Sequence, residues 1–319
     1  MKTLHISIAQ ITCIDGAVEQ NLSHAYDLAR EAHANGSELL LFPEFLTQGY
    51  RLTPDLWDSA ELFDGPSTSF LSEASARFGM YMGTSFLEAK AGHFYNTFAF
   101  SNPSGKITGV VRKRFPSMWE AYFFKGFDGD HVFETDFGRV GVGICFDNHT
   151  YKVASLIAKG YPDLVLMPHS YCTPTVPNKL YTLHDIERLK KLPVNVAHLY
   201  NGWLGVPVVL CNKSGNWNSP VPNRIFGSPS GFKFSGRSSI IDANGNTLAE
   251  LGEEEGIGYG QISIHAGSCR KAEIPKYSRY IYPGPAGREI TRLMELQGYL
   301  SYRFSRKRKE KAKFSLKSA

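Results

Sequence analysis

Apolar and polar residues alternate along this chain in two different rhythms. Residues 5–13 (HISIAQITC) alternate with the two-residue period of a half-buried strand. Residues 21–36 follow the period of an amphipathic helix that ends at Gly36, and the largely apolar run of residues 37–45 (SELLLFPEF) predicts a second strand. A strand, a helix and a second strand in this order predict a βαβ beginning.

The same alternation continues through the middle of the chain. Residues 69–79 predict a helix, and residues 80–115 predict consecutive strands joined by glycine-containing turns. The glycine-rich, apolar residues 139–147 (RVGVGICFD) predict a strand inside a sheet rather than at its edge. A helix over residues 151–160 and a strand over residues 163–168 are expected next.

Two further units complete the pattern. Residues 182–202 predict a helix with a break near Pro193, and residues 206–213 predict a strand. Residues 238–251 predict a hairpin, because their Ala-Asn-Gly-Asn turn supplies residues that tolerate positive φ. Strands that alternate with helices and also pair through hairpins predict a mixed sheet covered by helices.

The chain divides by composition into a long first part and a basic end. Residues 1–265 contain no internal repeat or low-complexity linker, so we expect one domain there, followed by a Tyr-, Pro- and Lys/Arg-rich C-terminal extension over residues 266–319. Of the net charge of +5, residues 303–319 contribute +7 through eight Lys or Arg and one Glu, which leaves −2 for the rest. We expect a solvated basic tail, with nucleic-acid contact as the less favoured alternative.

Composition also bears on location and cofactors. No run approaches the roughly 18 apolar residues of a membrane span, and the first residues lack the features of a signal peptide, so we expect a soluble, cytoplasmic protein. The five cysteines are an odd number and include no C-x-x-C pair, which argues against a disulfide framework and a zinc site. We therefore expect reduced thiols, no metal and no cofactor.

Three reactive side chains directly follow predicted strands. Glu44 follows SELLLFP, Lys113 follows ITGVVR and Cys145 follows RVGVGI, and chemistry in such folds gathers at the carboxyl ends of strands. Taken singly, each has an ordinary structural explanation: a loop charge, a solvated lysine and a small core residue. Together they supply a base, a cation and a nucleophile for attack on an amide or nitrile carbon.

Three motifs carry a family resemblance. FPEFLTQGY, VVRKRF and GRVGVGICFD, in this order, resemble the nitrilase superfamily of carbon–nitrogen hydrolases over about residues 4–265. The resemblance implies an α/β fold, a four-layer α-β-β-α sandwich with mixed central sheets. It also implies that Glu44 is the general base and acid, that Lys113 stabilises the oxyanion, and that Cys145 is the nucleophile that becomes acylated.

The resemblance extends to further site residues. It points to Glu120, in WEAYFFKG, as a second active-site glutamate that holds Lys113 and orients the substrate or the hydrolytic water. The backbone N–H of Phe146, next after the nucleophile, is the expected second oxyanion donor.

The residues after the nucleophile separate branches of the superfamily. True nitrilases typically show Cys-Trp-Glu-Asn, whereas residues 145–148 read Cys-Phe-Asp-Asn, as is common among amidases and carbamoyl hydrolases. The resemblance therefore favours an amide or N-carbamoyl small-molecule substrate, hydrolysed through a thioester. Nitrile hydrolysis, acyl transfer to another acceptor and a non-catalytic binding protein remain alternatives. Many of these amidases carry an Arg and an aromatic residue where this chain has His149 and Thr150.

His149 allows a competing chemical interpretation. A thiol–imidazole pair with Cys145 is the protease-type alternative, but it leaves Glu44 and Lys113 without roles. A polar residue in the pocket wall is the simpler interpretation.

Substrate specificity is expected from side chains in loops around these residues, although ordinary packing explains any one of the aromatics equally well. The candidates are Tyr50, Trp119, Tyr122, Phe146, His149, His169 and Tyr171. Residues 213–234, rich in Gly, Pro, Asn and Ser, are expected to be an exposed loop or a lid. The resemblance further implies a homodimer or larger even-numbered homo-oligomer, whose interface the Tyr-rich residues 276–284 are candidates to cross. No membrane partner is expected.

Overall fold

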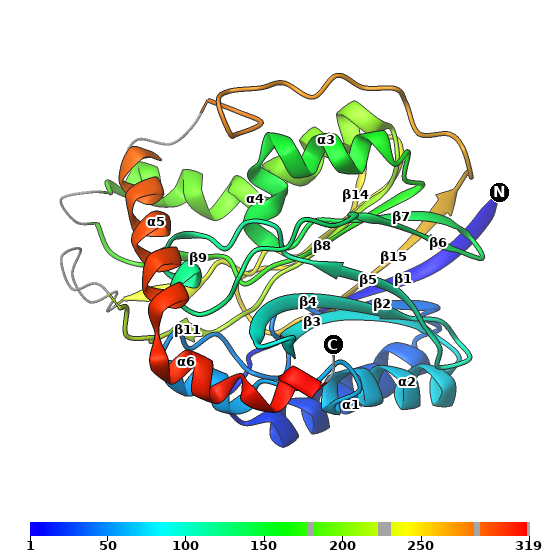
Figure 1. The fold of residues 1–319 in the computed structure, drawn as a ribbon. Coiled ribbons are helices and arrows are strands. Elements are labelled where there is room, and N and C mark those ends of the chain that lie inside the picture. Colours follow the sequence, from blue (N-terminus) through cyan, green and yellow to red (C-terminus); the bar gives the residue numbers. More distant parts are fainter. Residues whose placement is uncertain (178–180, 223–230, 284–287, 318–319) are drawn as a thin grey trace.

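The structure of the chain is a computed structural model that describes residues 1–177, 181–222, 231–283 and 288–317 (Figure 1). Two six-stranded sheets form its centre. The first sheet contains, in spatial order, β15 (Gly256–Ile264), β1 (Lys2–Gln10), β2 (Leu39–Leu41), β3 (Tyr81–Lys90), β4 (His93–Ser101) and β5 (Ile107–Arg112). It is mixed, because β2 runs parallel to β1 and β3 while the other neighbours are antiparallel.

The second sheet has the same mixed character. It contains, in spatial order, β14 (Thr247–Glu250), β13 (Ser239–Ile241), β10 (Val208–Cys211), β8 (Leu164–Pro168), β7 (Gly138–Val142) and β6 (Val132–Thr135). The β10–β8 and β8–β7 pairs are parallel. The glycine-rich strand β7 lies between β8 and β6, so the prediction of an interior strand is confirmed.

Helices cover the outer face of each sheet. Figure 1 shows α1 (Val18–Ala34) and α2 (Pro66–Phe78) below the first sheet, and α3 (Tyr151–Lys159) and α4 (Leu183–Leu204) above the second. The inner faces meet in one buried core, in which Leu4 and Ile6 of β1 join Val140 of β7. The predicted four-layer α-β-β-α sandwich with mixed sheets is confirmed.

Helix α4 differs from its prediction. It runs without interruption from Leu183 to Leu204 and contains Pro193, so the predicted break is wrong. Pro193 removes one backbone hydrogen bond, but the helix buries this residue together with Val194, Ala197 and Tyr200. Packing of that face against the sheet outweighs the local preference of proline.

A third, small sheet occupies part of the predicted loop. It pairs β11 (Asn216–Trp217), β12 (Phe232–Phe234) and β9 (Cys172–Pro174). Within residues 213–234, residues 216–217 and 232–234 are therefore in strands, and residues 223–230, on which the lid prediction also falls, lie outside the described residues.

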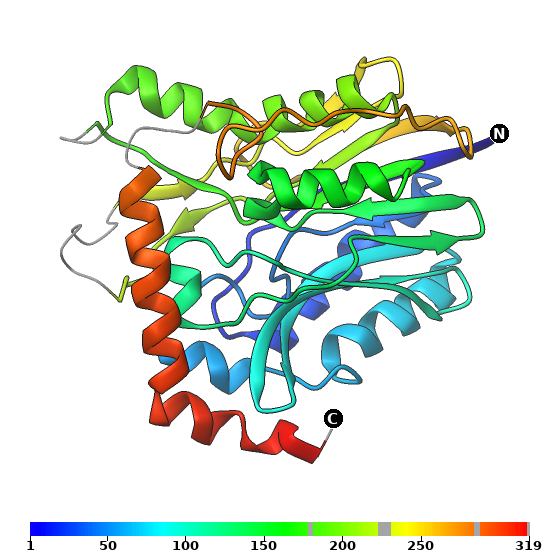
Figure 2. The same cartoon turned by 45° about the horizontal axis from the view of Figure 1, so that its top comes forward.

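The C-terminal extension packs onto its own chain. After β15 it crosses the outer face of α3 and α4, and α5 (Arg288–Phe304) then runs along the edge of the sandwich to α6 (Arg306–Lys311) and the 3-10 helix η5 (Lys313–Lys317), as Figures 1 and 2 show. Helix α6 reaches the 3-10 helix η1 (Pro54–Ser59).

The basic end of the extension is ordered, so the predicted solvated tail is wrong. Tyr302 and Arg308 are only 3% and 5% exposed. Arg308 donates to the carbonyl oxygen of Gly92 at 2.6 Å and to that of Tyr302 at 3.3 Å. Buried anchors that alternate with exposed Lys and Arg explain how so basic a segment packs.

One face of α5 remains open. Its apolar residues Leu293, Leu296, Leu300 and Phe304 are 67%, 57%, 44% and 67% exposed. Three expectations stay predictions: that the protein forms a homo-oligomer, that the C-terminal extension crosses its interface, and that a domain boundary follows residue 265. Among the described helices, none is both long and apolar enough to traverse a bilayer.

Candidate active site

Turns at the carboxyl ends of strands from both sheets bring Glu44, Lys113 and Cys145 together. Glu44 follows β2, Lys113 follows β5 directly, and Cys145 begins the 3-10 helix η3 (Cys145–His149) shortly after β7. Glu44 and Lys113 are fully buried and Cys145 is 6% exposed. The three predicted side chains therefore share one water-poor region.

Lys113 lies between two carboxylates. Its Nζ is 2.7 Å from Oε1 of Glu44, and 2.9 Å and 2.8 Å from Oε1 and Oε2 of Glu120. Burial works to lower the pKa of Lys113, but the charges of Glu120 and Glu44 outweigh it and raise that pKa. The ammonium therefore stays charged throughout the neutral range. We call Glu44, Lys113 and Glu120 the charged cluster.

Glu120 is fixed by its own 3-10 helix, η2 (Met118–Tyr122). The residue before that helix, Ser117, donates to Oε2 of Glu120 from its backbone N at 2.7 Å and from its Oγ at 3.0 Å. Oε1 accepts a hydrogen bond from Tyr50 Oη at 2.5 Å. Burial raises the pKa of Glu120, and Lys113 opposes that shift. Tyr50, predicted as a substrate-binding residue, thus contacts the charged cluster.

Glu44 has one occupied and one open oxygen. Its Oε1 accepts from Lys113 and, at 2.7 Å, from Nδ2 of Asn96 on β4. Its Oε2 is buried and has no hydrogen-bond partner among the described residues. The backbone is held on both sides, because Glu44 N donates to the His169 carbonyl at 3.3 Å and Ser170 Oγ donates to the Glu44 carbonyl at 2.9 Å. The carboxylate is oriented, yet one oxygen can still accept a proton.

The Cys145 thiol is protonated at neutral pH. Burial, followed by the charge of Glu44, raises its pKa well above the ordinary value, while Lys113 and the backbone N–H of Ser170 act in the opposite direction. Asp147, two residues on, accepts from the backbone N of Arg114 at 3.0 Å and of Phe115 at 2.9 Å. Asp147 therefore ties the turn of the thiol to the segment after Lys113.

Backbone strain coincides with this region. Three residues other than glycine have positive φ next to or within the cluster: Phe45 at 52°, Met118 at 41° and Cys145 at 49°. Such conformations cost about 1–3 kcal/mol each and persist only where the surroundings enforce them. At Phe45, Ser85 Oγ accepts from the backbone N at 3.0 Å, and Nζ of the buried Lys213 donates to the carbonyl at 2.9 Å.

The predicted substrate-binding residues fall into two groups. His149 has its ring centroid 6.0 Å from Tyr171, 6.2 Å from His169 and 6.3 Å from Phe146, which places these four side chains together beside the Cys145 turn. We call His149 and His169 the histidine pair. The rings in this group are stacked or edge-on, as aromatic neighbours prefer.

The second group lies on the side of Tyr50. Trp119 packs against Trp217 at a centroid distance of 5.7 Å, and Trp217 packs against Tyr50 at 6.1 Å. Tyr122 lies at the end of η2, where α5 approaches it. Trp217 belongs to the small third sheet, and we did not predict it.

The thiol–imidazole alternative has no support in the geometry. His149 Nδ1 is 2.9 Å from the hydroxyl of Tyr282, and its Nε2 has no hydrogen-bond partner among the described residues. No hydrogen bond joins Cys145 and His149 within the described ranges.

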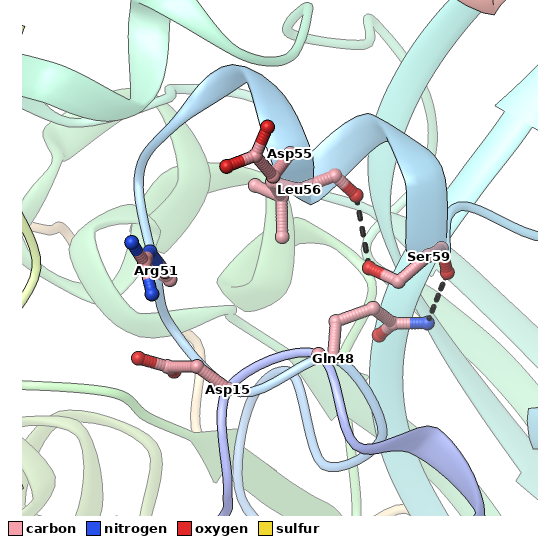
Figure 3. A pocket seen from close by; sticks show the side chains of 7 residues that line it. Asp15, Gln48, Arg51, Asp55, Leu56 and Ser59 are labelled. Atoms are coloured by element: carbon pink, nitrogen blue, oxygen red, sulfur yellow. Dashed lines mark hydrogen bonds between the residues drawn. The ribbon is translucent and has the colours of Figure 1, made fainter.

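A hollow close to this region is separate from it. It has a volume of about 160 Å³ and lies between Asp15 and η1. Figure 3 shows two hydrogen bonds at its side: Nε2 of Gln48 donates to the carbonyl oxygen of Ser59, and Oγ of Ser59 donates to the carbonyl oxygen of Leu56. None of its lining residues belongs to the charged cluster or the histidine pair. Within the described part of the chain, no group of three or more His, Cys, Asp and Glu side chains is placed to hold a metal ion.

Of three further contributing residues, Asn96 and Tyr282 were not predicted as site residues, and Ser170 was predicted only as one of the loop residues around the site. Asn96 orients Glu44 from the middle of an apolar strand, Ser170 contacts both Glu44 and Cys145, and Tyr282 binds His149 from the C-terminal extension. An uncharged polar residue inside YNTFAF was a usable signal for Asn96, since a buried amide requires a partner. The position of Ser170 shortly after the strand of residues 163–168 is a local signal, whereas no local pattern marks Tyr282.

Fold and sequence comparisons agree on the class of protein. The structure matches that of a carbon–nitrogen hydrolase from Helicobacter pylori with a TM-score of 0.73 and 19% identity, over 96% of each chain. The family model of the carbon-nitrogen hydrolases matches residues 5–271, and the chain belongs to that family.

Curated relatives narrow the class. The chain is 27% identical to omega-amidase NIT2 from Bos taurus over 289 residues, 88% of this chain and 95% of that protein. It is 26% identical to N-carbamoylputrescine amidase from Arabidopsis thaliana over 259 residues, 78% of this chain and 82% of that protein. The protein is an amidase-type carbon–nitrogen hydrolase in the amidase-like branch of the nitrilase superfamily.

Proposed function

We propose that this enzyme uses Cys145 to hydrolyse a non-peptide C–N bond in a small amide or N-carbamoyl compound through a thioester, releasing ammonia or an amine. One observation carries the proposal: Lys113 is held at 2.7–2.9 Å from two buried carboxylates, and one of them, Glu44, whose charge acts on the Cys145 thiol, has an oxygen with no hydrogen-bond partner among the described residues. The cation and the base are positioned before any substrate arrives.

Acylation would begin with the thiol. Cys145 Sγ attacks the carbonyl carbon while its proton passes to Oε2 of Glu44, and the π electrons of the carbonyl move onto oxygen. The resulting oxyanion is stabilised by the Lys113 ammonium and the backbone N–H of Phe146. When the oxyanion collapses, the C–N bond breaks and the proton on Glu44 passes to the leaving nitrogen.

Deacylation repeats these roles with water. Glu44 takes a proton from the water, whose oxygen attacks the thioester carbon and forms a second oxyanion at Lys113 and Phe146. The C–S bond then breaks, the sulfur takes the proton back, and the acid product leaves. Glu120 acts through Lys113, because it holds the ammonium in place together with Tyr50.

The high pKa of Cys145 fits this sequence of proton transfers. A pre-formed thiolate would face the charges of Glu44 and Glu120 in a buried site, so the thiol loses its proton only as the new S–C bond forms. The base must therefore lie beside the sulfur, as Glu44 does.

The test combines trapping and substitution. Wild-type protein is incubated with a panel of small amides, N-carbamoyl compounds and nitriles; ammonia release is assayed, and the acyl adduct is located by mass spectrometry. Cys145→Ala should abolish both turnover and adduct, with an unchanged circular dichroism spectrum. Cys269→Ala, which changes a half-buried thiol outside the cluster, is the matched control and should keep both. Turnover by Cys145→Ala, or an adduct on another cysteine, would contradict the proposal.

A further inference from the structure

The histidine pair carries two nitrogen atoms that the protein itself does not use. His149 is 2% exposed and His169 is fully buried, and their ring centroids are 6.2 Å apart. Nε2 of each ring is buried and has no hydrogen-bond partner among the described residues. Leaving a buried polar nitrogen unpaired costs free energy, which a ligand that bonds to it restores.

The hydrogen bond on the other side of His169 decides what its Nε2 can do. Nδ1 of His169 is 3.0 Å from the carbonyl oxygen of Met167. A carbonyl only accepts, so Nδ1 carries the hydrogen. Burial lowers the pKa of His169 to about 4, which keeps the ring neutral. Its Nε2 therefore carries a lone pair and can accept a hydrogen bond.

His149 is neutral as well, but its tautomer is adjustable. Burial, together with the charges of His169 and Lys113, lowers its pKa to about 3. Nδ1 is 2.9 Å from the hydroxyl of Tyr282, which can donate or accept, so Nε2 of His149 can adopt the complementary role. Tyr282 lies beyond residues 5–271, the part of the chain that matches the family model.

The pair lies beside the reacting groups. His149 stacks on Tyr171, which packs against the core cluster that contains Cys145, and on Phe146, which follows Cys145 in the chain. The backbone of His169 accepts a hydrogen bond from Glu44 N. The pair thus borders both the residue that follows Cys145 and the backbone of Glu44, which makes it a candidate to contact the part of a substrate next to the reacting carbonyl.

The cations near the pair are already neutralised. Lys113, whose charge acts on both rings, is bound by Glu44 and Glu120. Arg279, 5.0 Å from the ring of Phe146, is bound by both carboxylate oxygens of Glu295 at 2.5 Å and 3.1 Å. A substrate carboxylate would meet a lone pair on His169 and no unpaired cation among these residues.

We propose that His149 and His169 form the subsite for the acyl group, and that this subsite selects an uncharged acyl chain bearing an O–H or N–H group that donates to His169 Nε2. The inference rests on the proposed amidase function and names the class of substrate. His149, with Tyr282, contacts the same polar group from the other side.

Three amides of matched size test the proposal with wild-type enzyme. 4-Hydroxybutanamide offers a terminal O–H, pentanamide replaces that hydroxyl by a methyl group, and the monoamide of succinic acid replaces the terminal CH2OH group by a carboxylate. The expected order of kcat/KM is hydroxyl, then methyl, then carboxylate, with about tenfold between the first two, as one good hydrogen bond provides. Equal values, or a preference for the carboxylate, would overturn the inference.

Variants assign the preference to the pair. His169→Phe removes the acceptor, and the hydroxyl-to-methyl ratio of kcat/KM should fall towards one; His169→Gln keeps a side-chain oxygen and should retain part of that ratio. His149→Arg introduces an unpaired cation, and it should raise kcat/KM for the amide with the carboxylate relative to kcat/KM for the amide with the methyl group. An unchanged ratio in folded His169→Phe would overturn the assignment, and the wild-type series remains decisive if that variant does not fold.

The outcomes distinguish a failure of the proposed subsite from a failure of the proposed amidase function. If no compound forms an adduct on Cys145, the proposed function fails and the subsite fails with it. If adducts and ammonia release appear but the carboxylate amide is preferred, the function stands and only the subsite is wrong.

Discussion

The charged cluster and the histidine pair are both buried beside Cys145, yet they satisfy their polar atoms in opposite ways. In the charged cluster, Lys113 is bound by two carboxylates, and Oε2 of Glu44 is the one carboxylate oxygen left without a partner among the described residues. In the histidine pair, each ring uses one nitrogen within the protein and leaves the other unpaired. The charges of the cluster are paired within the protein, whereas the free nitrogens of the histidine pair are the ones that we propose a ligand completes.

The comparison teaches that burial alone does not make groups equivalent. Buried charges must be compensated within the protein, because leaving one unpaired costs several kcal/mol. A buried neutral imidazole with one free nitrogen costs only about 1–3 kcal/mol, so the fold can leave that bond to a substrate. In our proposal, reaction chemistry and substrate selection therefore fall to different neighbours of one thiol.

Removing the central cation should have the largest effect. Lys113→Met leaves the carboxylates of Glu44 and Glu120 buried without their partner, and we expect a loss of about 3–5 kcal/mol in unfolding free energy. Loss of the oxyanion's cation should lower kcat/KM by about 10³-fold or more. Urea denaturation and steady-state kinetics check both values.

The matched control is Lys125→Met, which removes an exposed lysine shortly after η2. It should stay close to wild type in both measurements. A Lys113→Met enzyme with wild-type kcat would remove the basis for calling the charged cluster catalytic.

Burial of the neutral histidine pair should make the free energy of unfolding depend on pH. The folded-state pKa of His149 is lowered to about 3, whereas an unfolded histidine titrates near 6.5. The stability contributed by the neutral ring is therefore fully present above about pH 6.5 and is lost as the pH falls towards the folded-state value. Between pH 6.5 and 4 this amounts to about 3 kcal/mol for one such histidine.

His149→Gln should make that slope shallower by about one proton, measured as the free energy of urea unfolding at several pH values. His184→Gln, which changes an exposed histidine at the start of α4, should keep the wild-type slope. Identical slopes in all three proteins would mean that His149 is not held neutral by burial.

A smaller effect is expected from the hydrogen bond that supports Glu120. Tyr50→Phe removes the 2.5 Å bond to Oε1 and should cost about 1.5–3 kcal/mol in transition-state stabilisation, a fall of about 10- to 100-fold in kcat. Tyr26→Phe, on α1 against Phe78, is the control and should leave kcat unchanged. If KM rises while kcat does not change, Tyr50 contacts substrate instead of positioning Glu120.

The smallest effect should come from the contact between α5 and η2. A Cβ atom at Gly298 would lie 2.8 Å from Cβ of Ala121 and 2.8 Å from Cδ2 of Tyr122, so Gly298→Ala forces α5 and the helix of Glu120 apart. We expect a loss of about 1–3 kcal/mol in unfolding free energy and a modest fall in kcat.

Gly202→Ala is a matched control, because Gly202 lies inside α4 with no atom within 4 Å of an added Cβ. That substitution should stabilise the protein slightly, since alanine is favoured over glycine inside a helix. Equal changes in unfolding free energy and kcat at the two positions would show that α5 is not packed closely against η2.

The residue pattern predicted the mixed sheet covered by helices and the positions of Glu44, Lys113 and Cys145 for the same physical reason, whereas the four layers were implied by the family resemblance. Strand ends are local signals, and Glu44, Lys113 and Cys145 each follow a recognisable strand. Glu120 was assigned by resemblance to the family. His149 and His169 were predicted only as two separate candidates. Each ring leaves Nε2 unpaired because its Nδ1 contacts the protein, at Tyr282 for His149 and at Met167 for His169. Met167 and Tyr282 are distant from each other in the chain, so no local pattern shows this.

Tertiary packing accounts for what the sequence analysis got wrong. Local preference predicted a break at Pro193 and a solvated tail, but burial against the second sheet keeps α4 continuous, and the bonds of Arg308 keep the tail in place. None of these long-range contacts has a local signature.

The left-handed backbone at Phe45, Met118 and Cys145 has a consequence for how this protein changes under selection. Glycine is the residue that these dihedral angles favour, and at Cys145, the smallest of the three side chains, a library enriched only for thermal stability would tend to introduce glycine. Turnover opposes that drift, because glycine carries no sulfur. The proposed nucleophile thus occupies a position where the demands of folding and of the proposed chemistry oppose each other.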